Sequence, residues 1–323
     1  MTSVDFGWVR GKCREIVEAV SRAVVGKDDV LESALMGIVA NGHLLLEDVP
    51  GVAKTLAAES FARVLDLEFR RIQFVPDLLP GDVTGGFVYS PRRETFEFRP
   101  GPIFANLVLA DEVNRGTPKT QSALLEAMQE RHVTVEGQCF PLTLPFLVIA
   151  TQNPIEFEGT YPLPEAQVDR FIARLRIGYP SPEAERNMLN RRQERKSDDL
   201  DLAPVVTKDE LLRIQAAVEN VYVSPDVEEY IVRIVWETRN DRRLQLGASP
   251  RGSLAVFKLA RARAAIRGRD FVTPEDVKAV AVPALAHRLL LRTELWVDRV
   301  PNEEILNDIL TIVPTPKVAQ GGE

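Results

Sequence analysis

The segment that most constrains this chain lies at residues 44–55 and reads LLLEDVPGVAKT. Its three leucines predict a short buried strand, the following residues a tight loop, and Lys54-Thr55 the start of a helix. This arrangement is typical of a phosphate-binding loop, because backbone N–H groups and the helix N-terminus both attract phosphate. Lys54 is then expected to reach the β- and γ-phosphates, and the Thr55 hydroxyl to ligate Mg²⁺.

The loop departs from the strict pattern G-x-x-x-x-G-K-[ST], because Asp48 replaces the first glycine and Ala53 the second. Aspartate tolerates a positive φ better than most residues, and alanine fits if residue 53 keeps a helix-like φ. Taken alone, an ordinary strand-to-helix turn remains the alternative. The residues predicted to contact a nucleotide here are Gly51, Val52, Ala53, Lys54, Thr55 and Leu56.

Short apolar runs alternate with helical patterns through the first half of the chain. The strand candidates are residues 44–46, 68–74, 107–110, 146–150 and 174–177. Helical patterns cover residues 55–65 and 120–131. This alternation predicts an α/β fold in which a parallel sheet is covered by helices on both faces.

Polar side chains follow two of these strand candidates. Asp111 is placed to hold Mg²⁺, directly or through water, and Glu112 to polarise a water for attack on the γ-phosphate. Asn153 follows the strand candidate at 146–150 and could contact the γ-phosphate or position that water. Ligands of parallel sheets bind at the carboxyl ends of the strands, which favours this interpretation. The alternatives are a helix cap for the carboxylates and a turn residue before Pro154 for the asparagine.

Two arginines are candidates for stabilising a phosphoryl-transfer transition state. Arg170 lies in the segment PEAQVDRF, and such an arginine often acts from a neighbouring subunit. Arg174 and Arg176 compete with it for this role. Arg251 begins a helix after Pro250 and could reach back to a nucleotide held between two domains, with a surface arginine as the alternative.

Two segments interrupt the alternation of strands and helices. Residues 80–102 are rich in Gly and Pro and contain the alternating run TFEF, which predicts a hairpin or loop insertion. Residues 132–140 predict a second hairpin that turns at Glu136-Gly137.

The chain changes character at residues 179–182, which read YPSP. Beyond them, long amphipathic stretches predict helices at residues 183–195, 208–220, 226–240, 251–267 and 273–290. We therefore expect two domains: a nucleotide-binding core at 1–179, with an insertion near 80–102, and a helical lid at 180–323. The basic run at 191–196 is interpreted as a solvated helix face rather than a nucleic-acid patch.

Composition excludes several classes of protein. The formal charge of −7, from 40 Lys+Arg and 47 Asp+Glu, argues against broad coating of nucleic acid, which needs clustered positive charge. Only Cys13 and Cys139 occur, so neither a disulfide framework nor a Cys-rich zinc site is expected. No apolar run approaches the ~18 residues of a membrane-spanning helix, and no signal peptide is evident, so a cytoplasmic location is expected.

Seven segments, taken in order, resemble an AAA+ ATPase and, more narrowly, the MoxR family. They are residues 46–55, 71–85, 110–115, 123–130, 150–154, 164–171 and 248–251. The likeness covers most of the chain and rests on no single short motif. It implies an AAA+ P-loop core followed by a smaller all-helical lid domain.

The resemblance also implies roles that agree with the chemistry above. Lys54 and Thr55 look like the Walker A pair, and Asp111 and Glu112 like the Walker B pair. Asn153 looks like sensor 1.

Further roles follow from the same likeness. Arg170 looks like the arginine finger, and Arg251 like sensor 2. Val25 and Gly26 resemble the segment near the adenine in such proteins, although a buried turn is the alternative.

Such proteins generally form hexameric rings with nucleotide at the subunit interfaces, which fits Arg170. The family is associated with chaperone-like remodelling, maturation or cofactor insertion of a protein client, often with a partner that carries a von Willebrand factor A domain. The insertions at 80–102 and 132–140 would face a central pore or a substrate, or serve as rigid decoration.

We therefore expect ATP hydrolysis that drives remodelling of a protein client. One alternative is a nucleotide-binding assembly scaffold with little turnover, which the negative charge of Asp48 near the phosphates would favour. The other is a DNA- or RNA-handling AAA+ motor, since helicase relatives carry similar insertions, although the net charge counts against it.

Overall fold

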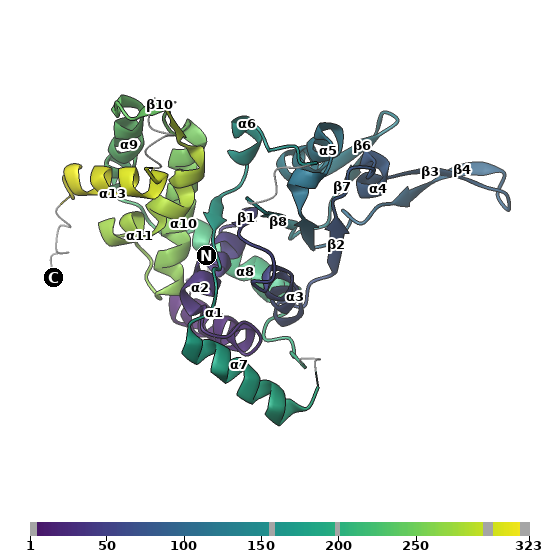
Figure 1. Cartoon of the computed structure of the whole chain (residues 1–323), viewed down its shortest axis with the longest axis horizontal. Helices are drawn as coiled ribbons and strands as arrows, with labels where there is room; N and C mark the ends of the chain where they lie inside the picture. Colours follow the sequence, from purple (N-terminus) through teal and green to yellow (C-terminus); the bar gives the residue numbers. More distant parts are fainter. Residues whose placement is uncertain (1–4, 155–158, 198–200, 293–299, 317–323) are drawn as a thin grey trace.

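A five-stranded parallel sheet forms the centre of the first half of the chain. The computed structural model describes residues 5–154, 159–197, 201–292 and 300–316. The strand order is β2-β5-β8-β1-β9, and all neighbouring strands are parallel. Figure 1 labels three of these strands, β1, β8 and β2, which lie in that order from left to right. The strands are β1 Leu44–Glu47, β2 Phe69–Gln73, β5 Leu107–Asp111, β8 Leu147–Gln152 and β9 Ala173–Leu175. All five strand predictions are confirmed, with ends that shift by a few residues.

Successive side chains of the strands enter two separate cores. Leu44 and Leu46 lie in the core beneath the first three helices, whereas Leu45 lies in the core beneath α5. Alternate side chains of a strand point to opposite faces of the sheet. Helices therefore pack on both faces, as predicted. The covering helices are α1 Phe6–Ser21, α2 Asp28–Val39, α3 Lys54–Val64 and α5 Pro118–Glu130.

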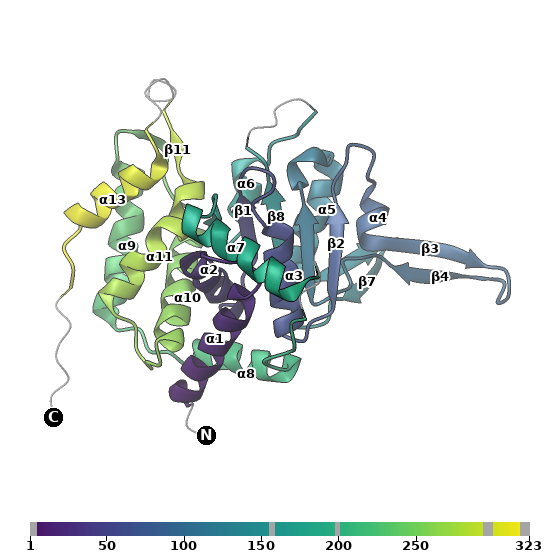
Figure 2. The ribbon, with the colours of Figure 1, turned by 60° about the horizontal axis from the view of Figure 1, so that its bottom comes forward.

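Two antiparallel hairpins extend the core, and both are confirmed predictions. After the short helix α4 (Pro80–Thr84), β3 (Gly85–Ser90) and β4 (Thr95–Pro100) project away from the body, as Figure 2 shows. The second hairpin pairs β6 (His132–Val135) with β7 (Gln138–Pro141).

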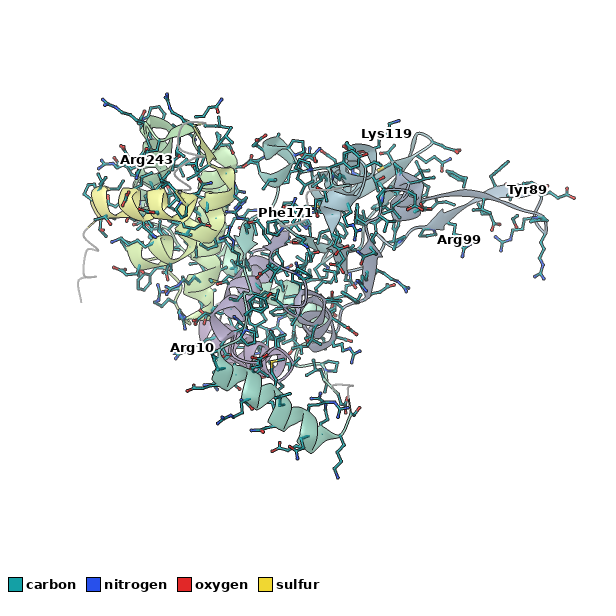
Figure 3. All side chains as sticks on the ribbon, viewed as in Figure 1. Arg10, Tyr89, Arg99, Lys119, Phe171 and Arg243 are labelled. Atoms are coloured by element: carbon teal, nitrogen blue, oxygen red, sulfur yellow. The ribbon has the colours of Figure 1, made fainter. Side chains whose placement is uncertain are left out.

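Aromatic rings join the two hairpins. Phe98 of β4 stacks on Phe140 of β7, with ring centroids 3.8 Å apart and planes inclined by 13°. Figure 3 places Arg99 near the base of the β3–β4 hairpin and Tyr89 close to its tip. The base of the projecting hairpin is therefore anchored, while Tyr89 stays half exposed at 50%.

Helices dominate the second half, as predicted. They are α7 Pro182–Arg195, α8 Lys208–Glu219, α9 Pro225–Asn240, α10 Pro250–Ile266, α11 Pro274–Leu285 and α13 Asn302–Ile312. Four of them carry proline in the first turn after a capping Ser181, Ser224, Ser249 or Thr273, because proline needs no hydrogen bond for its nitrogen there.

The helix predicted over 273–290 is too long, and its last part is wrong. Pro283 lies inside α11, which ends at Leu285, because proline removes a backbone donor from the helix. The chain continues through a 3₁₀ turn, η2 (Ala286–Arg288), into β11 (Leu290–Leu291), which pairs with β10 (Leu244–Leu246).

The helices of the second half contact the core in two places. α11 contacts the edge strand β9, and Arg288 of η2 donates to the carbonyl oxygen of Phe171 at 2.7 Å. At the second place, α8 and α10 contact α1 and α2, and Arg191 of α7 donates to the carbonyl oxygen of Ser21 at 3.1 Å. The division of the chain near residue 180 remains a prediction.

Among the described residues, no helix is both long enough and apolar enough to cross a membrane.

Candidate functional site

The predicted site residues lie at opposite ends of the parallel strands, which form a carboxyl edge and an amino edge of the sheet. Because the strands are parallel, the loop after β1, Glu112 after β5 and Asn153 after β8 all lie at the carboxyl edge. Arg170 precedes β9 at the amino edge, where the N–H of Ile172 donates to the carbonyl oxygen of His43 at 2.8 Å. The strands are about five residues long, and at about 3.3 Å per residue they separate the two edges by roughly 16 Å.

The phosphate-binding loop connects β1 to α3 at the carboxyl edge. Gly51 has a φ of 83°, and Ala53 has a φ of 61° and a ψ of 25°. The condition under which alanine fits here, a helix-like φ at residue 53, is therefore not met, because the left-handed residue directly before α3 is the alanine itself. This conformation costs an L-residue about 1–2 kcal/mol, since its Cβ crowds the following carbonyl oxygen. Val52 is buried, whereas Leu56 at the start of α3 is 36% exposed.

Replacing Ala53 with Gly should raise the free energy of unfolding by about 0.5–1 kcal/mol, because glycine adopts a positive φ without steric cost, which outweighs its greater entropy in the unfolded chain. Urea denaturation of both proteins measures the difference. Ala57→Gly in the interior of α3 is the matched control and should lower the stability by about 1 kcal/mol or more. A less stable Ala53→Gly protein would show that the alanine is not strained.

The Lys54 ammonium lies across the carboxyl ends of two adjacent strands. Its Nζ donates to the carbonyl oxygen of Asp48 at 2.6 Å and to that of Gln152 at 3.4 Å. The next residue, Thr55, is half-buried at the N-terminus of α3. These two side chains therefore occupy the edge of the sheet at which a phosphate group is expected.

Backbone donors engage the Asp48 carboxylate at the first glycine position. Oδ1 accepts from the N–H of Val49 at 2.8 Å, and Oδ2 accepts from the N–H of Gly178 at 2.5 Å. Gly178 follows β9, so this side chain ties the phosphate-binding loop to the segment that leads into α7. The two bonds account for an aspartate where the strict pattern has glycine.

Asp111 at the end of β5 is almost buried and holds three hydrogen bonds. Its Oδ1 accepts from the Thr151 hydroxyl at 2.6 Å. Its Oδ2 accepts from both Nε and Nη2 of Arg71, at 3.0 and 2.6 Å. Such charge-assisted bonds fix the orientation of the carboxylate at this edge.

Glu112 has a left-handed backbone, with φ 54° and ψ 49°. Its N–H donates to the Thr151 hydroxyl at 2.8 Å, and its Oε2 accepts from Gln73 Nε2 at 2.7 Å and Arg115 Nη1 at 3.0 Å. Holding a non-glycine residue in this conformation requires support from its surroundings. The side chain is 27% exposed, so one carboxylate is both held in place and reachable by water.

The sequence interpretation assigned no role to the residues that orient these carboxylates. Arg71 and Gln73 are two residues apart on β2, which neighbours β5 in the sheet, so they share the face that Asp111 and Glu112 approach. The alternation along β2 was a usable signal, but it becomes informative only once β2 is known to pair with β5.

Asn153 and the Val25–Gly26 turn, which are also predicted to contact the nucleotide, are both closely packed. Asn153 is 4% exposed, and its carbonyl oxygen accepts from Asn114 Nδ2 at 3.4 Å. Val25 is buried, and Gly26 has a φ of 71° with its Cα facing α7, since a Cβ there would lie 2.6 Å from the Cβ of Ala184. The Val25–Gly26 turn is thus closely packed under α7.

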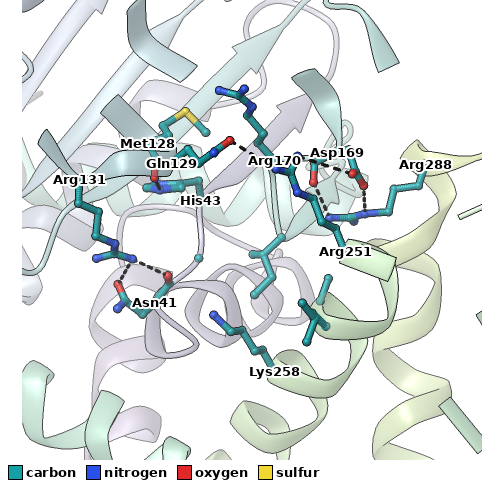
Figure 4. A pocket seen from close by; sticks show the side chains of 14 residues that line it. Asn41, His43, Met128, Gln129, Arg131, Asp169, Arg170, Arg251, Lys258 and Arg288 are labelled. Atoms are coloured by element: carbon teal, nitrogen blue, oxygen red, sulfur yellow. Dashed lines mark hydrogen bonds and ion pairs between the residues drawn. The ribbon is translucent and has the colours of Figure 1, made fainter. Parts of the chain in front are cut away.

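A basic pocket of about 330 Å³ lies at the opposite, amino edge (Figure 4). The carboxylate of Asp169 lies among several cations there: Arg288 Nε donates to it at 2.8 Å, and Arg251 Nη1 lies 3.9 Å away. Burial lowers the pKa of the Arg288 guanidinium, and the Asp169 carboxylate opposes that shift. The charged side chains lining the pocket are Arg131, Asp169, Arg170, Arg251, Lys258 and Arg288.

Arg170 and its two sequence competitors have different environments. Arg170 Nη1 donates to the carbonyl oxygen of Leu125 at 2.7 Å, while its buried Nε has no hydrogen-bond partner among the described residues. Arg174 and Arg176 instead form ion pairs with Glu47, at 3.1 and 3.2 Å. Arg170 is therefore the arginine of the three that lacks a carboxylate partner within the described part of the chain.

The structure places Arg251 with Arg170 rather than with Lys54. Its Nη2 lies 3.4 Å from Gln129 Oε1 at the end of α5, on the same pocket that Arg170 lines. Within one chain, the phosphate-binding loop and the two predicted arginines are therefore on opposite edges of the sheet.

The donor chemistry of the carboxyl edge fits a Mg²⁺-bound nucleotide. The Thr55 hydroxyl and the Asp111 carboxylate are oxygen donors, and Mg²⁺ commonly takes one or two protein oxygens together with substrate phosphates and water. The described residues hold no group of three His, Cys, Asp or Glu side chains that could bind a metal by themselves. A metal here would therefore depend on the phosphates of a nucleotide.

Comparisons with known proteins agree with this geometry. Residues 43–173 match the family model described as ATPase family associated with various cellular activities (AAA), and residues 236–309 match the model of an AAA lid domain. The chain is 47% identical to Chaperone MoxR1 of Mycobacterium tuberculosis, over 93% of this chain and 81% of that protein. It is 30% identical to Protein MoxR of Methylorubrum extorquens, over 92% of this chain and 93% of that protein. A crystal structure of a candidate ATPase from Cytophaga hutchinsonii has 40% identity and a TM-score of 0.89, over 97% of both chains.

Proposed function

Because this chain belongs to the MoxR family of AAA+ ATPases, we propose that it hydrolyses ATP and uses the cycle to remodel, mature or load a protein client. The observation that carries the proposal is the carboxyl edge of the sheet. The Lys54 ammonium lies there against the ends of β1 and β8, and the Asp111 and Glu112 carboxylates lie at the end of β5, the other neighbour of β8. This is the set of groups that phosphoryl transfer to water requires.

In the proposed mechanism, the loop N–H groups and the N-terminus of α3 bind the phosphates of ATP. Lys54 neutralises the β- and γ-phosphates, and Thr55 and Asp111 hold Mg²⁺, which when bound offsets the negative charge that develops on the phosphate oxygens. Glu112 orients a water and accepts its proton. Asn153 helps to position that water, and the turn at Val25 and Gly26 lies near the adenine.

The remaining positive charge that stabilises the transition state comes from the arginines of a neighbouring subunit. Arg170 and Arg251 lie about one strand length from the phosphate-binding loop of their own chain. In a closed ring, by contrast, the amino edge of one subunit can face the carboxyl edge of the next. We therefore propose a ring, a hexamer as is general for such proteins, in which both arginines reach the nucleotide bound by the adjacent subunit.

The wider role follows from the relatives. One of them is named a chaperone, which supports a protein client here. Members of the family often act with a protein that carries a von Willebrand factor A domain, so we include such a partner in the proposal. The half-exposed Tyr89 near the tip of the projecting hairpin is suited to touching a client. A cytoplasmic location is proposed with these roles.

Steady-state phosphate release tests the proposal. The protein should turn over ATP in the presence of Mg²⁺, and Lys54→Ala should abolish turnover because the phosphates lose their cation. ATP binding without turnover would support the assembly scaffold instead. Strong stimulation of turnover by single- or double-stranded DNA or by RNA would support a nucleic-acid motor.

A further inference from the structure

The carboxylate of Asp169, the residue directly before Arg170, contacts three side chains of the second half of the chain. The Ser249 hydroxyl donates to its oxygens, at 3.1 Å to Oδ1 and 2.9 Å to Oδ2. Arg288 Nε donates to Oδ1 at 2.8 Å, and Arg251 Nη1 lies 3.9 Å from Oδ2, as the convergence of these groups in Figure 4 shows. One carboxylate thus joins the segment that carries Arg170 to the helix that carries Arg251.

Arg288 holds the backbone on both sides of Arg170. Its side chain is only 3% exposed, and Nη2 donates to the carbonyl oxygen of Asp169 at 3.1 Å and to that of Phe171 at 2.7 Å. A buried guanidinium requires its partners, because an unpaired charge in the interior is costly. The Asp169 carboxylate and the backbone around Arg170 are therefore held in one arrangement.

Ser249 transmits the same contact to Arg251. It is the N-cap of α10, and its Oγ accepts from the N–H of Arg251 at 3.1 Å while its hydroxyl hydrogen is available to Asp169. The Arg288 stem packs against the same turn, since a Cβ at Gly252 would lie 3.3 Å from Arg288 Cδ. The first turn of α10 is therefore placed relative to the core through Asp169.

From these contacts we infer that Asp169 is a positioning residue for both Arg170 and Arg251, and that it holds their guanidinium groups as one unit at the subunit edge. The inference rests on the proposed function, in which both arginines act on the nucleotide of the adjacent subunit. Asp169 itself need not touch that nucleotide. It acts through geometry, because a small displacement of a positioned charge lowers the rate steeply.

The test begins with Asp169→Asn in the full chain, which keeps the shape of the side chain and removes its charge. The variant should assemble and bind ATP with an unchanged Kd, because its own phosphate-binding loop is at the other edge. Its kcat should fall on the order of 100-fold. A wild-type kcat would overturn the inference.

Mixing experiments separate positioning from a general structural defect. Lys54→Ala subunits, which keep their arginines, should restore turnover when mixed with Asp169→Asn subunits. Asp169→Asn subunits should fail to restore turnover to Arg170→Ala subunits, because their own arginines are displaced. Restoration in that second mixture would overturn the inference, and so would a loss of ATP affinity that parallels the loss of turnover.

A second variant covers the case in which Asp169→Asn does not fold. Ser249→Asp keeps an acceptor for the Arg251 N–H but places a carboxylate against Asp169, and it should reproduce the same pattern. Ser224→Ala is the matched control, because it removes the N-cap of another helix, α9, and should leave kcat unchanged. If Arg170→Ala itself retains wild-type turnover while Lys54→Ala abolishes it, the role proposed for Arg170 is wrong and this inference falls with it, whereas a protein with no ATP turnover at all would contradict the proposed function. If only the Asp169 and Ser249 variants retain it, this inference alone is wrong.

Discussion

Replacing Glu112 with Gln should lower the kcat of ATP hydrolysis by about 10²–10⁴-fold while ATP still binds. Glutamine keeps the size of the side chain, and its carbonyl oxygen can still accept from Arg115 or Gln73, so the left-handed backbone at residue 112 should persist. What the amide cannot do is accept a proton from the attacking water. Phosphate release under saturating ATP, together with the Kd for ATP, measures both halves of the prediction.

The control for this variant is Glu59→Gln on α3. Glu59 pairs with Arg63 on the exposed side of the helix and lies outside the carboxyl edge, so its kcat should equal that of the wild type. Unchanged turnover in Glu112→Gln would show that another group activates the water, and the assignment of the site would be lost.

Replacing Arg170 with Ala should lower kcat by about 10³-fold or more, as expected for an arginine that stabilises the charge of the transition state. The Kd for ATP should stay unchanged, because Arg170 lies at the amino edge of the sheet while the proposed ATP site of its own subunit is at the carboxyl edge. Among the described residues, few contacts stabilise the fold through this side chain, since Nη1 bonds to one carbonyl oxygen and Nε to none. The same phosphate-release and binding assays apply.

Arg176→Ala is the discriminating control for Arg170. Arg176 is 61% exposed and pairs with Glu47 and Glu303, so its charge is already matched within the chain. Most of the activity should survive its removal. A larger loss of kcat in Arg176→Ala than in Arg170→Ala would transfer the finger role to Arg176.

Much of the carboxyl edge could be predicted from the sequence because it depends on local patterns. Buried parallel strands appear as continuous apolar runs, and the residue after each run falls at the same edge. Asp111, Glu112 and Asn153 follow from this pattern and Lys54 from the pattern of the phosphate-binding loop, and neither requires the strand order. The β6–β7 hairpin could also be predicted from a local pattern, because Glu136-Gly137 supplies the positive φ values of a tight turn.

The features that sequence reasoning missed depend on tertiary contacts. Arg71 reaches the Asp111 carboxylate because β2 lies next to β5, and the sequence of β2 does not indicate which strand will be its neighbour. The grouping of Arg251 with Arg170 depends on how the helices dock against β9, which brings Arg288 and Ser249 onto Asp169. The left-handed φ of Ala53 is not predictable from the sequence for another reason, since the intrinsic preference of alanine favours a negative φ and the geometry of the loop overrides it.

An active site shared between adjacent subunits is tested most directly by mixing two inactive variants. Lys54→Ala subunits should fail to hold ATP productively but keep both arginines, whereas Arg170→Ala subunits should bind ATP normally but lack the proposed finger. If the site is shared, the mixture should regain turnover at interfaces where an intact Arg170 faces an intact phosphate-binding loop, although each variant alone is inactive. If Arg170 instead serves the nucleotide of its own chain, the mixture stays as inactive as its components, and the shared site is contradicted.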